Sequence, residues 1–307
     1  MSPAPTPTSA DRLFARHPRQ WGSFQYVYPV ISRRSRGLSI GINLNADKVC
    51  NWDCVYCQVD RTQPPARRDV DLEQVRRELD GLLAWSVSGQ IWQEGPLAGT
   101  PQHLRQLRDI AFSGDGEPTT FPAFDQAVAL AAEAKQRHDL TDTRLVVLTN
   151  LSMIHRPAVA QGLALLDQAG GEVWAKLDAG TDAYYKQVDR AAGRLEQLVE
   201  NIRLTGQSRS LVIQSMFMEL HGAAIPDAEF DAYLDRLEEL IDGGCRIRLV
   251  QIYTIARQTA EPYAAPLSRT RLESLLGWLK RRLPDLPAET FGGIDRNSPA
   301  VGDEIGA

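Results

Sequence analysis

Three cysteines of this 307-residue chain fall within eight residues, and their spacing could do metal or redox chemistry. The stretch CNWDCVYC, residues 50–57, leaves three residues between Cys50 and Cys54 and two between Cys54 and Cys57. A loop with this spacing can turn three thiolates into one cage, and thiolate suits soft metals and iron–sulfur clusters. The fourth cysteine, Cys245, lies far down the chain. A structural zinc site would need four ligands, whereas three thiolates around a cubane cluster leave one iron open to a non-protein ligand.

A second stretch, SGDGEPT at residues 113–119, also carries residue types that could bind a small molecule. Gly114 and Gly116 allow the backbone to approach a ligand closely and permit φ values that other residues avoid. Glu117 supplies a carboxylate that could accept a hydrogen bond from an ammonium group. A Gly-Asp-Gly sequence is also a good turn, so these residues alone leave both interpretations open.

The elements that must position these residues alternate along the chain. Strand-like runs lie at residues 38–44, 109–113, 145–148, 172–177, 211–217 and 247–253. Helix-like spacing of apolar residues follows at 71–85, 124–135, 158–168, 195–202, 230–241 and 268–283. Six strands alternating with helices imply parallel strands joined by right-handed crossovers. Periodicity does not choose between an open sheet and a partial barrel, but either fold places functional residues at the carboxyl ends of its strands.

Polar side chains occur at several of these strand ends. They are Asn150 and Ser152 after the third strand, and Lys176 and Asp178 after the fourth. A helix N-cap is the alternative role for Ser152 and for Asp178. On the fifth strand Gln214 and Ser215 must point to opposite faces, and we assign Gln214 to the interior.

The cysteine motif, with aromatic Tyr56 directly before its last cysteine, resembles that of the radical S-adenosylmethionine (SAM) superfamily. Gly116 and Glu117 are similar to the end of that family's glycine-glycine-glutamate segment, although Asp115 replaces the first glycine. The resemblance implies a partial (βα)6 barrel of parallel strands. It also implies a 4Fe-4S cluster on Cys50, Cys54 and Cys57, whose open iron is chelated by SAM. One electron then cleaves the SAM sulfonium and releases a deoxyadenosyl radical, which abstracts hydrogen from the substrate. The implied SAM contacts are Tyr56, Asp115, Gly116, Glu117, Asn150, Ser152, Lys176, Asp178 and Gln214.

Four phrases look like the branch that includes the tRNA wyosine-base synthases: GINL at 41–44, the cysteine motif, GDGEPT at 114–119 and KLDA at 176–179. Members of that branch hold a second cluster with upstream cysteines, but this chain has no cysteine before Cys50. We therefore expect a single-cluster enzyme with an unassigned substrate and a flavodoxin or ferredoxin-type electron donor. The branch, together with a basic turn at Arg33, Arg34 and Arg36, suggests RNA as the substrate. A solvated loop is the simpler interpretation of that turn, and a phosphate or nucleic-acid contact is the alternative.

Other substrates are open from the sequence: a peptide, a protein or a small metabolite. A hypothesis of another class is a non-catalytic metal-binding or electron-transfer module, which predicts a fourth protein ligand and no SAM affinity. Neither the branch resemblance nor the basic turn decides between these alternatives. The net charge of -5 weakens the case for RNA, because it opposes broad adhesion to an anionic polymer.

Composition sets the remaining expectations. With 43% hydrophobic and 24% charged residues, the chain can bury a substantial core. No apolar run approaches the roughly 20 residues that span a bilayer, and clustered cysteines point to a reducing compartment, so we expect a cytoplasmic protein without a membrane segment. We expect a flexible extension at residues 1–20, a radical SAM partial barrel at 21–262, and a C-terminal helix and tail at 263–307.

Overall fold

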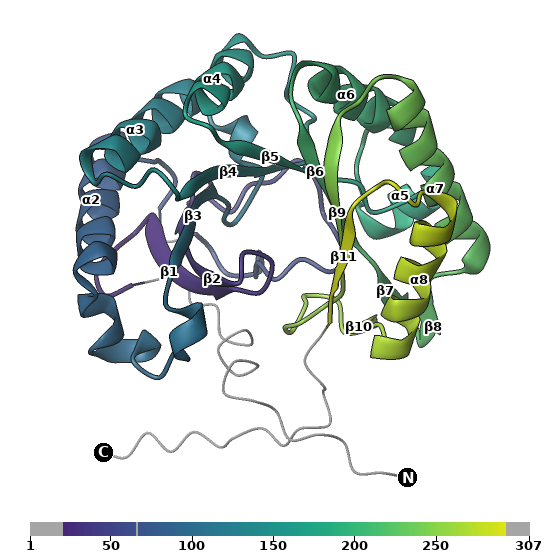
Figure 1. Cartoon of the computed structure of the whole chain (residues 1–307), viewed down its shortest axis with the longest axis horizontal. Helices are drawn as coiled ribbons and strands as arrows, with labels where there is room; N and C mark the ends of the chain where they lie inside the picture. The colour runs from purple at the N-terminus through teal and green to yellow at the C-terminus, as the bar shows by residue number, and fades with distance from the viewer. Residues whose placement is uncertain (1–20, 66, 293–307) are drawn as a thin grey trace.

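The computed structural model of the chain describes residues 21–65 and 67–292. The predicted extension at residues 1–20, and the tail from residue 293, lie outside the described residues. Within them, a curled sheet of eight strands forms a half-barrel, with helices around its outer face (Figure 1). The predicted fold, a partial barrel of parallel strands, is confirmed.

The sheet runs in the order β1-β2-β3-β4-β5-β6-β9-β11. Its strands are β1 (Val27–Ser32), β2 (Gly37–Ile42), β3 (Leu107–Phe112), β4 (Arg144–Thr149), β5 (Glu172–Lys176), β6 (Leu211–Met216), β9 (Ile247–Tyr253) and β11 (Ala288–Phe291). β1 is antiparallel to β2, and every other neighbouring pair is parallel. The six predicted strands are β2 to β6 and β9, while β1 and β11 add one unpredicted strand to each edge.

Helices cover the convex side of this sheet (Figure 1). They are α2 (Leu72–Ser88), α3 (Phe124–Arg137), α4 (Pro157–Gln168), α5 (Asp182–Val188), α6 (Leu195–Ser208), α7 (Asp227–Asp242) and α8 (Arg269–Arg282). α2 illustrates the local rules: Asp71 accepts hydrogen bonds from the first-turn amides of Glu73 and Gln74, and Gly89 ends the helix with a φ of 75°. None of the described helices combines the length and apolar character needed to cross a bilayer.

Shorter elements complete the fold. Residues 90–104, between α2 and β3, contain three single-turn 3-10 helices: η1 (Gln90–Trp92), η2 (Gly95–Leu97) and η3 (Gln102–Leu104). A fourth, η4 (Pro118–Thr120), follows the glycine-rich segment after β3. A small antiparallel sheet in the order β10-β7-β8 is formed by β7 (Met218–Leu220), β8 (Ala223–Ala224) and β10 (Ala264–Pro266).

The two faces of the sheet are packed differently. The large apolar core lies between the sheet and the helices. Inside the half-barrel only a small apolar cluster forms, from Ala111, Val146, Trp174 and Val212. Side chains two residues along from this cluster include polar Asp109, Lys176 and Gln214, which line a cavity. The concave face is therefore hollow and lined by both polar and apolar side chains, as is common for ligand pockets.

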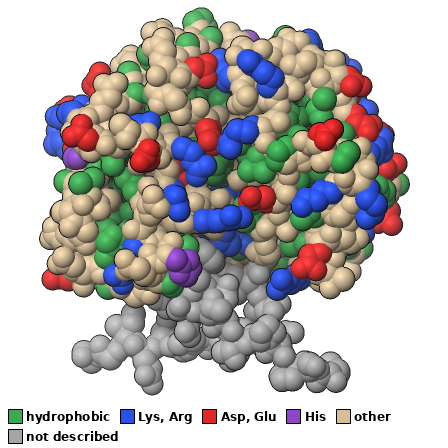
Figure 2. Space-filling view, viewed as in Figure 1, with side chains coloured by type: hydrophobic (Ala, Val, Ile, Leu, Met, Phe, Trp, Pro, Cys, Tyr) green, Lys and Arg blue, Asp and Glu red, His purple; other side chains and the backbone are tan. Residues whose placement is uncertain are grey.

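Charge is distributed unevenly over the surface. Figure 2 shows Lys and Arg side chains gathered around the middle of the face that looks down the half-barrel, with Asp and Glu side chains among and beside them. The net charge of -5 therefore does not describe every face of the molecule.

Candidate active site

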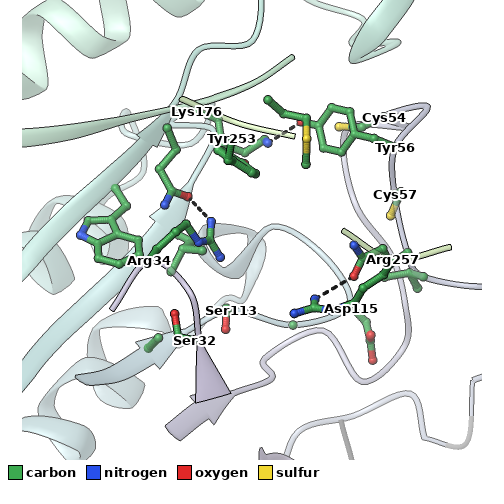
Figure 3. A pocket seen from close by; sticks show the side chains of 18 of the residues that line it. Ser32, Arg34, Cys54, Tyr56, Cys57, Ser113, Asp115, Lys176, Tyr253 and Arg257 are labelled. Carbon is green, nitrogen blue, oxygen red and sulfur yellow. Dashed lines mark hydrogen bonds between the residues drawn. The ribbon is translucent and has the colours of Figure 1, made fainter. Parts of the chain in front are cut away.

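A cavity of about 280 Å³ lies inside the half-barrel and reaches the loops at the carboxyl ends of the strands (Figure 3). The predicted site residues on its wall are Cys50, Cys54, Tyr56, Cys57, Asp115, Gly116, Glu117, Asn150, Lys176 and Gln214. Ser152 and Asp178 do not line it. Residues separated by up to 164 positions in the sequence thus share one cavity, as the parallel strand order predicts.

Backbone hydrogen bonds hold the cysteine loop in place. The amides of Asp53 and Val55 donate to the carbonyl oxygens of Asp189 (3.2 Å) and Val188 (2.9 Å) at the end of α5. The carbonyl of Cys57 accepts from the amide of Ala260 at 3.0 Å. A loop without regular secondary structure is therefore fixed by two distant segments, one of which is a helix that the sequence did not predict.

Side chains after β4 provide a further anchor for this loop. Asn51 donates from Nδ2 to Ser152 Oγ at 2.6 Å, and its Oδ1 accepts from Asn150 Nδ2 at 2.9 Å. Ser152 also donates to Asn150 Oδ1 at 2.6 Å. The N-cap alternative for Ser152 is wrong, because the N-cap of α4 is Arg156. The geometry gives Ser152 a role in positioning Asn51, and its predicted contact with SAM is not supported by its place behind the cavity wall.

The glycine-rich segment after β3 packs tightly against the chain that leads into the cysteine loop. A Cβ on Gly116 would lie 2.7 Å from Asn45 Cγ and closer still to Val49 O, and one on Gly114 would lie 2.7 Å from Asn43 Cγ. Since real Cβ atoms do not approach that closely, both positions require glycine for space. Asn43 and Asp115 also exchange hydrogen bonds at 2.7 and 3.1 Å. This segment therefore does more than form a turn: it fits against the cysteine loop.

Glu117 is buried at the end of this segment, with 4% of its surface exposed. Its Oε1 accepts hydrogen bonds from the amide and hydroxyl of Thr119 (3.1 and 2.6 Å) and from Thr149 Oγ1 (2.6 Å). Its Oε2 accepts from the amide of Asn150 at 2.8 Å. Burial raises the pKa of Glu117, although these hydrogen bonds oppose the shift. A carboxylate oxygen can accept two hydrogen bonds, so Oε2 has capacity for a ligand donor at the cavity wall.

Tyr56 joins the cysteine loop to a charged pair on β5. Its hydroxyl hydrogen-bonds to Asp178 and to Lys176, and the Lys176 ammonium lies 4.8 Å from the centre of its ring. Lys176 Nζ and Asp178 Oδ2 form an ion pair at 3.0 Å. Burial alone would lower the pKa of Lys176, but the combined attraction of Asp178, Tyr253, Cys54 and Asp189 outweighs it and the net shift is upward.

Asp178 itself is fully buried, and its Oδ1 accepts from the amide of Met216 at 2.7 Å. The N-cap alternative for Asp178 is wrong, because Thr181 caps α5. The structure therefore gives Asp178 a place beneath Lys176 and Tyr56 rather than on the cavity wall predicted for a SAM contact. Asp189, which the sequence did not single out, lies beside this pair with Oδ2 buried and unpaired within the described chain. Burial, reinforced by repulsion from Asp178, raises its pKa.

The basic turn between β1 and β2 divides its arginines between the cavity and the surface. Arg34 donates from Nη1 to Gln214 Oε1 at 2.8 Å inside the half-barrel, and Arg33 also lines the cavity. Arg36 pairs with Glu289 at 3.0 Å. Arg34 is thus neither a solvated loop residue nor an outward contact for a polymer. The assignment of Gln214 to the interior is confirmed, since Ser215 faces α7 and hydrogen-bonds to Tyr233 at 2.7 Å.

Arg61 is a site residue that the sequence did not reveal. It donates from Nη1 to Cys57 Sγ at 3.0 Å and from Nη2 to the carbonyl of Asp115 at 3.2 Å. It therefore bridges the cysteine loop and the glycine-rich segment. Its position four residues after Cys57 was the only available signal.

The donor set suits a cluster better than a single ion. No group of three His, Cys, Asp or Glu side chains in the described part of the chain is arranged to hold one metal ion. An iron–sulfur cluster instead takes its cysteine ligands on separate iron atoms, and Cys50, Cys54 and Cys57 share one cavity wall. Burial raises the pKa of the Cys50 and Cys54 thiols, so iron ligation must supply the energy that deprotonates them. The fourth cysteine, Cys245, is buried against Gly206 and Ile202, on α6.

Comparison with known proteins agrees with this geometry. Residues 47–218 match the family model described as the radical SAM superfamily. A UPF0026 protein from Methanocaldococcus jannaschii is 30% identical over 162 residues, which cover 53% of this chain and 43% of that relative. The chain spans less than two thirds of the length of each of the first three curated relatives that it matches.

Comparison with solved structures supports the fold through one match with a TM-score above 0.5. Streptococcus suis SuiB bound to S-adenosylmethionine matches with a TM-score of 0.56 and 12% identity, over 85% of this chain and 52% of that one. TYW1 with a lysine-pyruvate adduct bound matches at a TM-score of 0.43 and 15% identity, over 80% of this chain and 74% of that one. The latter score is too low to assign a branch.

The family model covers more than half of the chain, so the chain belongs to the radical SAM superfamily. It is accordingly an enzyme, and the cofactors of its family are a 4Fe-4S cluster and SAM. The predictions of superfamily, enzyme and cofactors are thereby confirmed.

Proposed function

We propose that this enzyme cleaves SAM reductively at a single cluster held by Cys50, Cys54 and Cys57, and abstracts hydrogen from a substrate inside the half-barrel. The observation that supports it best is the close fit of Gly116 against the chain entering the cysteine loop. That fit brings the thiols and the Glu117 carboxylate to one cavity wall. When bound, the cluster supplies the electron that breaks the SAM sulfonium bond.

The residues of the chain have separable tasks in this proposal. Glu117 Oε2 and the neighbouring Asn150 face the cavity and are suited to the SAM ammonium group. Lys176 supplies a positive charge for a carboxylate on the same wall. Tyr56, Asp115, Gly116 and Gln214 complete the proposed contacts. Asn51, through Ser152 and Asn150, holds the loop in position.

Glu117 must be ionised to attract an ammonium group. Burial opposes ionisation, and four hydrogen bonds to its oxygens favour it. A cation arriving at Oε2 would shift the balance further toward the carboxylate. Binding of the ammonium group and deprotonation of Glu117 are therefore coupled.

The reductant proposed is a flavodoxin or ferredoxin-type protein, since the family needs an external electron. RNA is the substrate suggested by the likeness to wyosine-base synthases. The basic side chains on the face in Figure 2 would favour an anionic polymer. The basic turn no longer supports RNA, because Arg33 and Arg34 line the cavity and Arg36 is paired with Glu289. Peptides, proteins and small metabolites are therefore equal candidates by geometry.

The test is SAM cleavage by anaerobically reconstituted protein with dithionite. We expect deoxyadenosine from the native enzyme and none from Cys54→Ala. Cys245→Ala is the matched control, since Cys245 is buried on the far side of the sheet and should not affect cluster loading. Absence of product from native protein with a full complement of iron and sulfide would reject the proposal.

A further inference from the structure

One side of the cavity is lined by Arg34, Trp174, Gln214 and Tyr253, and we call this region the inner chamber. Trp174 precedes Lys176 by two positions on β5, so it lies roughly 7 Å further from the strand ends. Gln214 pairs in register with Lys176, and Tyr253 is the last residue of β9. Figure 3 shows Arg34 on the opposite side of the cavity from Cys57. The inner chamber is thus continuous with the cysteine site and lies across the cavity from Cys57.

Arg34 is held there with its faces covered. Its guanidinium carbon lies 5.7 Å from the centre of the Trp174 ring and 5.1 Å from that of Tyr253. Such contacts stabilise a cation and fix its plane. Gln214 Oε1 accepts one hydrogen bond from Arg34, and Gln214 is itself held by donating to Gln251 Oε1 at 2.7 Å. The guanidinium is therefore preorganised before any ligand arrives.

The guanidinium of Arg34 has more N–H donors than the described residues provide hydrogen-bond acceptors for it. A guanidinium has five N–H groups, and the described residues accept one hydrogen bond from Arg34. No carboxylate within the described chain lies within 4.0 Å of its nitrogens. Lys176, also on the cavity wall, pairs with Asp178. Asp109 on the same wall accepts from Ser39 and faces Arg144 at 3.9 Å, and Arg34 attracts it from beyond ion-pair distance. Asp109 Oδ2 has no hydrogen-bond partner among the described residues. Arg34 is thus a fixed cation that faces a cavity and lacks an ion-pair partner.

We propose that Arg34 binds an oxyanion group of the substrate, a carboxylate or a phosphate, at the inner chamber. The planar fork of arginine matches two oxygens of such a group. An anchor across the cavity from Cys57 would leave the rest of the substrate extending toward the cysteine loop, where hydrogen abstraction is proposed. That the bound anion belongs to a substrate rests on the proposed function, whereas anion binding by Arg34 can be measured without turnover.

The experiment titrates reconstituted native protein with inorganic phosphate and, separately, with acetate, by calorimetry and tryptophan fluorescence. We expect saturable binding of at least one anion, weakened about tenfold or more in Arg34→Met, as expected for the loss of a charge-assisted hydrogen bond. Arg34→Lys keeps the charge but loses the fork, and should bind with intermediate affinity. Arg36→Met is the matched control from the same turn and should bind as the native protein does, because Arg36 faces Glu289 outside the cavity.

Each outcome decides the matter. The anion with the higher affinity identifies the anchored group. If neither anion binds the native protein, or if Arg34→Met binds equally well, the proposal is overturned. If Arg34→Met fails to fold, the native protein is compared with Arg34→Lys, and equal anion affinity of these two proteins overturns the proposal.

The titration is repeated with SAM bound. Competitive loss of anion binding would assign Arg34 to SAM and overturn the substrate role. Failure of the native protein to cleave SAM would reject the proposed function but leave anion binding by Arg34 intact.

Discussion

At the scale of single residues, the site depends on short contacts between loops that are distant in sequence. Cys50, Cys54, Cys57 and Glu117 were predictable, because chemistry requires those residue types at those spacings. The partners that position them were not. Asn51 bonds to Ser152 across 101 residues, and Arg34 bonds to Gln214 across 180. Such pairs leave no local pattern, and the roles assigned to Ser152 and the basic turn changed once their neighbours were known.

Gly116→Ala tests the contact between the two loops. The added Cβ would overlap Val49 O and Asn45, so we expect the cysteine loop to shift and stability to fall by about 1–3 kcal/mol, as in other overpacked sites. The iron retained per chain after reconstitution should fall as well. Gly99→Ala is the control, because a Cβ there meets nothing within 4 Å. Native iron content in Gly116→Ala would contradict this account of the site.

Thiol labelling tests whether Cys245 stands apart from the cluster ligands. Burial raises the pKa of Cys245 to about 11, despite the opposing effect of Arg203 and Arg246. Because only the thiolate reacts, labelling of Cys245 in the folded protein should be slow at pH 7. Its rate should rise about tenfold per pH unit and level off near pH 11. Mass spectrometry of the labelled peptide gives the labelling rate of Cys245. Rapid labelling at pH 7 would show that Cys245 is not buried as described.

At the scale of elements, the long strands and helices could be predicted from the sequence, and the short elements could not. The six parallel strands and six long helices follow from runs of apolar residues with clear periodicity. α5 has seven residues, DAYYKQV, too few for a reliable apolar stripe. β11 has four, AETF, two of them polar, and it joins the sheet only by pairing with β9. Both missed elements are stabilised by tertiary contacts, which local sequence does not record.

Thr181→Ala tests whether α5 supports the cysteine loop. Thr181 caps α5 by accepting from the amide of Tyr184, and its hydroxyl donates to Glu229 at 2.6 Å. We expect a loss of about 1–2 kcal/mol in unfolding free energy, typical of a lost N-cap. Because α5 carries the carbonyls that bind Asp53 and Val55, cluster retention during gel filtration should also decrease.

Ser268→Ala removes the same type of cap from α8, where Ser268 accepts from the amide of Arg271 at 3.1 Å. We expect Ser268→Ala to lower the unfolding free energy measured in urea by about as much as Thr181→Ala does, but to leave cluster retention unchanged. Equal cluster loss in the two variants would mean that α5 has no special role.

At the scale of the whole molecule, the half-barrel divides its work between two faces. Its convex face carries the apolar core that holds the fold together, and its concave face is hollow, with polar and apolar side chains on the cavity wall. The alternation of strands and helices predicts a parallel α/β sheet, and the resemblance to the radical SAM family implies the partial barrel. The position of Arg34 on the cavity wall could not be predicted, since Arg34 comes from a turn at the opposite end of the sheet from the cysteines.

The central claim is that three thiolates leave one iron of the cluster open for SAM. The most direct measurement is electron–nuclear double resonance of the reduced cluster with SAM labelled with ¹⁵N at its amino group. We predict a ¹⁵N coupling that appears with labelled SAM, survives Cys245→Ala and is replaced by a ¹⁴N coupling when unlabelled SAM is used. A fully loaded cluster that shows no coupling to SAM, or that shows a fourth protein ligand on its last iron, would contradict the account.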